Sequence, residues 1–224
     1  MNTRIEHDTM GEIAVPADHH WGAQTQRSLE NFRIGGQRQP REIITAFACL
    51  KEACARANAR CGKLTEAQAG AIAEACRQIR AGQWDEEFPL VVWQTGSGTQ
   101  TNMNVNEVIA HLAAEQGVSL HPNDHVNASQ SSNDTFPSAL HIAAAMSVVQ
   151  DVLPAARRLE AAFARLEAAY PDLIRIGRTH LQDATPLRFS QEVSGWRELV
   201  AAPCRMLEAA LPELERLAIG GTAV

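Results

Sequence analysis

The sequence predicts a mainly α-helical fold, and three observations support this prediction. Alanine is abundant among the 224 residues and there is a single tyrosine, a composition that favours helices over sheets. Apolar residues recur at helical spacing through several long stretches. Glycine or proline stands at the ends of most of these stretches, where either residue can begin or end a helix. The length allows one or two domains with a sizeable core.

The N-terminal third combines an irregular segment with two helices. Residues 1–39 predict short strands or turns and end in a Gly-Gly break. A proline then suits the first turn of a helix over residues 40–62, whose apolar side chains follow helical spacing. Thr65-Glu66-Ala67-Gln68 forms a capping box, which predicts that a second helix begins here and ends near residue 82.

The remaining elements are also expected to be helical. A connector precedes a helix over about 101–116, and residues 118–134 are polar and rich in turn formers. Residues 136–169 are almost all helix formers, with a kink or join expected at Pro154. Another long helix is expected to run from about 189 towards 217.

Two long helices cannot bury both of their apolar faces alone, so they require further helices from this chain or from other subunits. A shift in composition near residue 135 suggests an N-terminal domain over 1–134 and a second domain over 135–224.

Composition also limits the possible partners and the compartment. The net charge of −6 argues against nucleic acid or an anionic membrane as a partner. The sequence opens without a signal-peptide pattern, and we expect that no apolar run reaches membrane-spanning length. The odd number of cysteines suits a reducing cytoplasm, and we expect free thiols at these positions: Cys49, Cys54, Cys61, Cys76 and Cys204.

Three polar segments interrupt the helical pattern, each at the mouth of a predicted helix: "TGSGTQTNMNVNE" (95–107), "HPNDHVNASQSSNDTFP" (121–137) and "GRTHLQDATP" (177–186). Helix N-termini present free N–H groups and favour anions. The same residues can equally serve as helix caps. Taken without any resemblance, the three segments suggest a metal-free site for a small anion.

Familiar motifs do not fit these segments. The glycines of the first segment match neither a dinucleotide fingerprint nor a P-loop, and the nucleophile-elbow pattern is absent. His121 and His125 are four residues apart, a spacing that could bind a metal on a helix. Because Pro122 and Asn123 favour a turn there, we do not expect a metal at this position.

The motifs "GSGTQTNMNVNEV", "HPNDHVNASQSSNDTFPSALH" and "GRTHLQDATPL" resemble class II fumarases of the fumarase/aspartase superfamily, and "MGEIAVPADHHWGAQTQRS" is similar to their N-terminal segment. The resemblance covers the whole chain. It implies a mainly α, fumarase/aspartase-like fold with an N-terminal helical domain followed by a truncated domain of long helices. In the family, four subunits form a twenty-helix core, and each active site combines segments from three subunits.

The implied reaction is the reversible hydration of fumarate to L-malate, with these dicarboxylates as partners and no metal or organic cofactor. The resemblance assigns His180 as the acid–base catalyst and assigns binding of the substrate carboxylates to Ser97, Gly98, Thr99, Ser131, Ser132, Asn133 and Thr179. It assigns a second dicarboxylate site to His121, Asn123 and Asp124, although the basic residues that precede this site in many relatives are replaced by "GVSL".

One departure from the family pattern concerns the catalytic base. Family members carry a mobile Gly-Ser-Ser loop, followed by Met-Pro, Lys and Asn-Pro, which supplies a serine base; these 224 residues contain no such segment. We therefore expect a truncated chain, equivalent to the N-terminal half of a subunit, that is inactive alone. Two alternatives stay open, namely an aspartate ammonia-lyase and an inactive dicarboxylate-binding or structural fragment.

Overall fold

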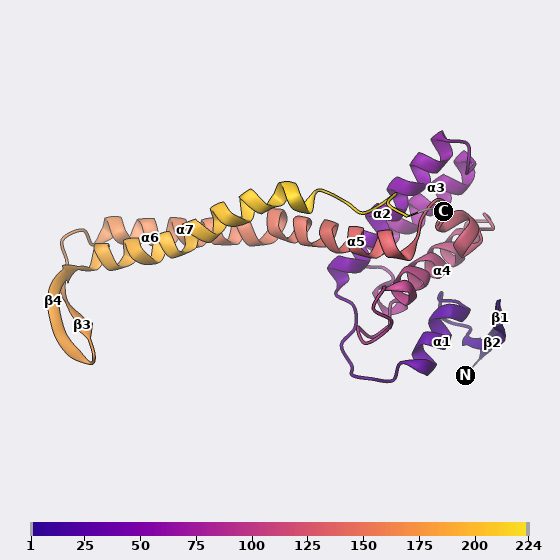
Figure 1. Cartoon of the computed structure of the whole chain (residues 1–224), viewed down its shortest axis with the longest axis horizontal. Helices are drawn as coiled ribbons and strands as arrows, with labels where there is room; N and C mark the ends of the chain where they lie inside the picture. Colours follow the sequence, from indigo (N-terminus) through magenta and orange to yellow (C-terminus); the bar gives the residue numbers. More distant parts are fainter. Residues whose placement is uncertain (1, 223–224) are drawn as a thin grey trace. The chain divides into compact units, whose positions relative to one another are not determined.

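The computed structural model describes residues 2–222, which form two compact units (Figure 1). The first unit contains the residues up to Ala143 together with those from Leu217 onward, and the second contains Ala144–Arg216. The junction at residue 143 and the domain boundary predicted near residue 135 fall on the same helix, α5 (Ser132–Ser147).

A hairpin and a short helix form the N-terminal part of the first unit. Strands β1 (Thr3–Asp8) and β2 (Gly11–Pro16) pair in antiparallel register, in agreement with the predicted short strands. Helix α1 (Ala23–Asn31) follows, although the sequence did not predict a helix there. Its pattern is polar, with only three buried residues, and this explains why no apolar periodicity revealed it.

Three longer helices follow, and their positions agree with the prediction. They are α2 (Arg41–Arg60), α3 (Glu66–Arg80) and α4 (Thr99–Glu115). The capping box at the start of α3 is confirmed, because Thr65 Oγ1 accepts a bond from Gln68 N while the Gln68 side chain accepts one from Thr65 N. A single 3-10 turn, η1 (Asp85–Glu87), lies in the connector before α4.

The core of the first unit lies between these helices. Helix α4 contributes an almost completely buried face, so its side chains connect the hairpin side of the unit to α2 and α3. Burial of this apolar surface is the main force that holds the unit together. The largest fully buried apolar side chains are Val15, Phe47, Ile72, Val105, Val108, Ile109, Leu112 and Val126.

The long helical stretch predicted over 136–169 contains an irregularity just before Pro154. A π-helical segment, η3 (Val148–Val152), separates α5 from α6 (Leu153–Ala169). Pro154 has no backbone N–H and cannot complete a regular i to i−4 ladder. The wider π turn therefore accommodates the proline, and the predicted join lies where it was expected.

The second unit pairs α6 with α7 (Phe189–Leu214), joined by a hairpin of β3 (Ile174–Thr179) and β4 (Gln182–Arg188) (Figure 1). The hairpin corrects one expectation, because "GRTHLQDATP" lies in these strands and their turn, not at the mouth of a helix. The tight turn at His180 and Leu181 favours a strand pair over the predicted loop.

One further expectation is wrong. The stretch Ser132–Ala169 is long and apolar enough, by length and composition alone, to cross a membrane, with a mean hydropathy of 1.4 over its most apolar window. Length and composition are weak evidence, because the core helix of a soluble protein passes the same test. The second unit also exposes large apolar side chains, including Leu159, Leu199 and Met206.

Candidate functional site

The start of α4 lies in the first predicted segment. Its N-cap, Gly98, has φ +68° and lies in the left-handed region that favours glycine. A Cβ at this position would overlap the ring of Phe136, so the position requires glycine for space as well as for conformation. The N–H groups of the first turn are therefore left without a capping side chain from the N-cap residue.

Hydroxyl groups connect the first segment to the second. Ser97 Oγ lies 2.9 Å from Thr99 Oγ1, and Thr99 Oγ1 lies 2.9 Å from Ser132 Oγ. The structure thus brings together the starts of α4 and α5, which are 33 residues apart in the sequence. Ser97 is exposed and the other two are partly buried, so the chain of hydroxyls leads from the surface inward.

Ser131 and Asp134 cap the start of α5. Ser131 Oγ accepts a bond from Asn133 N at 3.2 Å, and Asp134 Oδ1 accepts one from Ser131 N at 3.1 Å. This reciprocal pattern is equivalent to a capping box. The Asn133 side chain is exposed and Ser132 points to Thr99, so the capping role falls on Ser131 while its two neighbours remain available to a ligand.

A buried polar network fixes the second segment against α2 and α4. Lys51 Nζ donates to Asn127 Oδ1 and Gln130 Oε1, each at 2.9 Å. Asn102 also donates to Asn127 Oδ1, at 3.1 Å, and accepts a bond from Thr135 Oγ1 at 3.2 Å. Because buried polar groups are costly unless they are paired, this network specifies how the segment folds.

Lys51 is the basic residue of this network, and the fold shifts its pKa. Burial lowers its pKa to about 7, while the nearby Cys54, Cys76 and Asp134 act in the opposite direction. A neutral amine keeps two N–H donors, and the two amide oxygens that it contacts can accept both.

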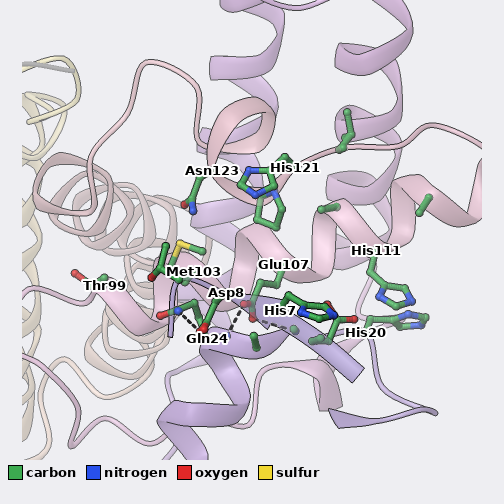
Figure 2. Close-up of a pocket in the computed structure, with 18 residues that line it drawn as sticks. His7, Asp8, His20, Gln24, Thr99, Met103, Glu107, His111, His121 and Asn123 are labelled. Atoms are coloured by element: carbon green, nitrogen blue, oxygen red, sulfur yellow. Dashed lines mark hydrogen bonds between the residues drawn. The ribbon is translucent and has the colours of Figure 1, made fainter. Parts of the chain in front are cut away.

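A pocket of about 830 Å³ lies between the N-terminal segment and α4 (Figure 2). Thr99, Met103, Glu107 and His111 reach it from α4 at four-residue intervals, so each lies beside the next on the helix surface. Asp8 and Gln24 line the pocket from the N-terminal segment, and Gln24 N donates directly to Glu107 Oε1 at 2.8 Å (Figure 2). The pocket therefore extends from the hydroxyl groups of the first segment to the C-terminal half of α4.

Glu107 lies on α4, far from α1 in the sequence, and its side chain caps the N-terminus of α1. Its carboxylate accepts bonds from Gly22 N (3.0 Å), Gln24 N (2.8 Å), Thr25 N (3.1 Å) and Thr25 Oγ1 (2.6 Å). Burial raises the pKa of Glu107, and the bonds from Thr25, Gln24 and Gly22 oppose that shift. Because α1 has a glycine N-cap, this carboxylate supplies the acceptor that a capping side chain would provide.

The three residues predicted for a second dicarboxylate site are close in sequence but differ in placement. His121 and Asn123 line the pocket, with Asp124 absent from its lining. Asp124 N donates to His121 Nδ1 at 3.2 Å, so the imidazole caps the π-helical turn η2 (Pro122–Val126). His125 Nδ1 accepts a bond from His121 N at 2.8 Å, which leaves that nitrogen unavailable to a shared metal.

Thr179 and His180 belong to the second unit, at the tip of the β3–β4 hairpin. His180 has φ +48° and Leu181 has φ +61°, both in the left-handed region used by tight hairpin turns. Both predicted residues are exposed, and Leu181 is 94% exposed. The imidazole is therefore presented on an exposed turn.

The sequence did not reveal the buried residues whose hydrogen bonds support the site. Lys51 lies within a helical stretch that was interpreted only through its apolar positions, and Glu107 was included in a quoted motif without a role. The asparagines of "TNMNVNE" gave a usable signal, because Asn102 and Asn106 are four apart and both donate to Asn127. Polar residues repeated on the buried face of a helix indicate a network of this kind.

Comparisons with known proteins agree with the resemblance. The chain is 55% identical over 230 residues to a class II fumarate hydratase of Bacillus cereus, with 100% of this chain and 50% of the relative covered. A crystal structure of class II fumarase from Schistosoma mansoni matches with a TM-score of 0.95 and 43% identity, covering 100% of this chain and 48% of the other. A fumarate lyase:delta crystallin structure from Brucella melitensis matches with a TM-score of 0.92 and 38% identity, covering 98% and 53%.

The chain spans about half the length of the curated relatives that it matches. The family model described as "Lyase" matches residues 11–224, which is nearly the whole chain. These matches confirm the predicted similarity to class II fumarate hydratases, and the chain belongs to the lyase family.

Proposed function

We propose that this chain forms part of a fumarate hydratase, which adds water to fumarate reversibly to give L-malate. The observation that carries the proposal is the continuous hydroxyl chain Ser97–Thr99–Ser132 at the starts of two helices. Hydroxyl donors next to the positive ends of helices suit a carboxylate. The similarity to class II fumarate hydratases identifies the dicarboxylate that such a site would take.

We assign binding of the substrate carboxylates to both segments. Ser97, Gly98 and Thr99 act from the start of α4, whose N-cap is the left-handed Gly98. Ser131, Ser132 and Asn133 act from the start of α5. During the reaction a proton leaves the carbon next to a carboxylate, and the resulting charge spreads onto that carboxylate. Donors that are already fixed in place stabilise this charge without reorganisation.

His180 is the acid–base group for the departing hydroxyl or attacking water in this proposal, and Thr179 adds a hydroxyl contact to the substrate. An imidazole changes protonation near neutral pH, which suits this role. The exposed tip of the hairpin suits a residue that acts on a site formed by several subunits. The exposed apolar residues of α6 and α7 fit a homotetramer in which other subunits cover them.

The second dicarboxylate site is proposed at His121, Asn123 and Asp124. His121 and Asn123 reach the pocket, which supports a peripheral contact with an anion. Asp124 places a carboxylate 3.2 Å from His121 Nδ1, so that an anion at this position would face a negative group. We therefore expect weak binding there.

The decisive experiment measures fumarate hydration by a full-length subunit that carries these 224 residues. His180→Asn should reduce kcat at least about 100-fold, because general acid–base catalysis contributes that much, while the oligomeric state stays unchanged. His7→Asn, which changes an exposed histidine of β1, is the matched control and should keep full activity. Unchanged turnover in His180→Asn would remove the imidazole from the mechanism.

The same protein separates the alternatives. Activity on aspartate without activity on malate would identify an ammonia-lyase and overturn the proposal. The isolated 224 residues should show no fumarate-dependent absorbance change, because they contain no Gly-Ser-Ser segment for the serine base. We further propose that the protein is cytoplasmic, that neither nucleic acid nor membrane is a partner, and that Ser132–Ala169 is a core helix of the assembly.

A further inference from the structure

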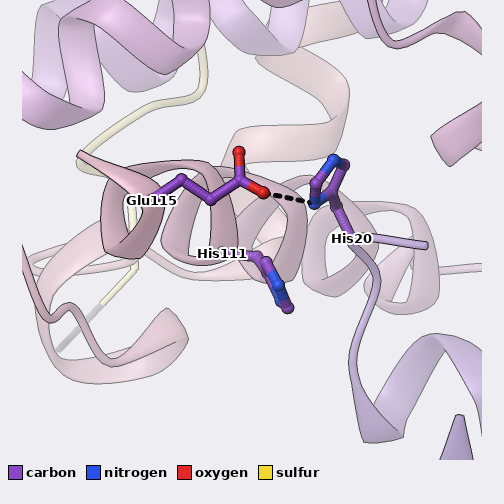
Figure 3. Close-up of side chains that lie close together, drawn as sticks. All are labelled: His20, His111 and Glu115. Carbon is purple, nitrogen blue, oxygen red and sulfur yellow. Dashed lines mark ion pairs between the residues drawn. The ribbon is translucent and has the colours of Figure 1, made fainter. Parts of the chain in front are cut away.

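His20 and His111, two histidines that line the pocket, lie close to Glu115, and none of the three has a role in the proposed reaction (Figure 3). His111 and Glu115 lie four residues apart on α4, so their side chains leave the same helix face. His20 comes from the segment between β2 and α1. One donor atom from each of the three side chains lies within 4.8 Å of the other two.

We propose that His20, His111 and Glu115 form a binding site for a divalent ion of the zinc class, such as Zn²⁺ or Co²⁺. Two imidazoles and one carboxylate suit these borderline metals better than Mg²⁺ or Ca²⁺, which take oxygen ligands. Three protein ligands leave a fourth position of a tetrahedral site for water.

The distances fit an ion after small side-chain movements. His20 Nδ1 lies 3.8 Å from Glu115 Oε1. Ligand atoms about 2.1 Å from a tetrahedral metal lie about 3.4 Å from one another, so this pair is already near the required separation. A separation of 3.8 Å is too long for a hydrogen bond between the two groups.

The hydrogen bonding of the His20 ring is a second, independent observation that supports the site. Its Nδ1 atom is buried and is without a hydrogen-bond partner among the described residues. Buried polar nitrogens are normally paired, so an orphaned one that faces a carboxylate and a second imidazole indicates a missing partner. A metal ion would satisfy this lone pair.

The surroundings hold the His20 ligand in place. His20 N donates to Glu87 Oε2 at 2.7 Å, and the buried Glu87 carboxylate thereby fixes the backbone at the ligand position. The rings of His20 and Trp84 pack in a T-shaped arrangement with their centroids 4.5 Å apart. Such support restricts the ring to a narrow range of orientations, as in natural metal sites.

The nearest fixed cation does not prevent metal binding. Arg4 is paired with Glu6, whose Oε1 lies 2.7 Å from Arg4 Nε, and its other nitrogens donate to the carbonyl oxygens of Pro16, His19 and Trp21.

The test is a titration of the metal-free 224-residue chain with Co²⁺, followed by the visible absorption of the bound ion and then by displacement with Zn²⁺. The wild-type chain should bind one Co²⁺ with the intense absorption of a four-coordinate site. His20→Ala and His111→Ala should each weaken Co²⁺ binding at least about tenfold. His7→Ala removes an exposed histidine that also lines the pocket, and it should bind Co²⁺ as the wild type does.

Glu115→Gln provides a variant that should fold normally, because the Glu115 side chain is 54% exposed. It should also weaken Co²⁺ binding, and circular dichroism should show unchanged helix content in all four variants. Binding that is equal in the wild type, His20→Ala and His111→Ala would overturn the proposal. A loss in His7→Ala as large as that in His20→Ala would show nonspecific histidine binding and would overturn it as well. If a histidine variant fails to fold, Glu115→Gln alone decides.

Discussion

Because Glu107 caps α1, removing its side chain should destabilise the first unit, and the magnitude of the loss follows from its hydrogen bonds. Replacing Glu107 by alanine removes the acceptor of four hydrogen bonds, three of which involve buried donors on Gly22 and Thr25. An unsatisfied buried donor costs about 1–3 kcal/mol, and water can reach part of the space that the side chain leaves. We expect Glu107→Ala to lower the free energy of unfolding of the first unit by about 3–5 kcal/mol.

The variant Glu107→Gln separates the contribution of the hydrogen-bond geometry from that of the buried charge. The amide oxygen can still accept the three bonds that converge on Oε2, while its NH₂ group faces the Gln24 N–H. Removing the charge also removes the cost of burying a carboxylate, which is the effect that raises the pKa of Glu107. The expected loss in the free energy of unfolding is therefore smaller, about 1–2 kcal/mol.

The assay is urea unfolding followed by circular dichroism and tryptophan fluorescence, combined with amide hydrogen exchange at Gly22 and Thr25 to localise the effect. Glu115→Ala is the control on the same helix, and an exposed substitution of this kind should change stability by less than about 0.5 kcal/mol. A Glu107→Ala chain within about 1 kcal/mol of the wild type would refute the capping argument.

Three other predictions concern the first unit. The pKa of Lys51 is 10.5 in its ordinary state and about 7 in the folded chain, so the unfolded chain binds more protons between these pH values and the free energy of unfolding should rise with pH, by up to about 2–3 kcal/mol from pH 7 to 9. Urea unfolding of Lys51→Met should show a flatter dependence of stability on pH than the wild type. Parallel pH profiles for the two proteins would contradict this prediction. Gly98→Ala should destabilise the unit by more than about 2 kcal/mol in thermal unfolding, since it combines a left-handed backbone with overlap on Phe136; an unchanged Tm would show that the helix start can shift freely. Exposed Cys61 should react rapidly with a thiol reagent, whereas burial raises the pKa of Cys76 to about 12 and should keep it unreactive until unfolding; mass spectrometry of labelled peptides would detect the reverse order.

The sequence predicted the helical elements with strong apolar periodicity and clear end signals. The capping box at Thr65 and the proline at position 154 indicated where α3 begins and where α5 and α6 join. Helix α1 was missed because its stability depends on an acceptor from α4, a contact that local sequence cannot reveal. The hairpin around His180 was missed because its polar residues resemble a loop when they are considered without their strand partner.

The candidate site was predicted in part. Motif resemblance identified Ser97, Thr99 and Ser132, and the structure places their hydroxyls in one hydrogen-bonded chain. Their roles in binding stay a prediction. Lys51 could not be predicted, because its neighbours Asn127 and Gln130 are far from it in the sequence and only folding brings them together.

The two buried carboxylates that hold the N-terminal segment contact mainly its main chain. Glu87 accepts from the amide of His20, and Glu107 accepts from the amides of Gly22, Gln24 and Thr25. Amide groups are common to nearly all residue types, so the contact between Glu87 and the amide of residue 20 does not depend on the side chain at that position. Evolution can therefore exchange residues such as that at position 20 and introduce new chemistry at the pocket without redesigning the fold.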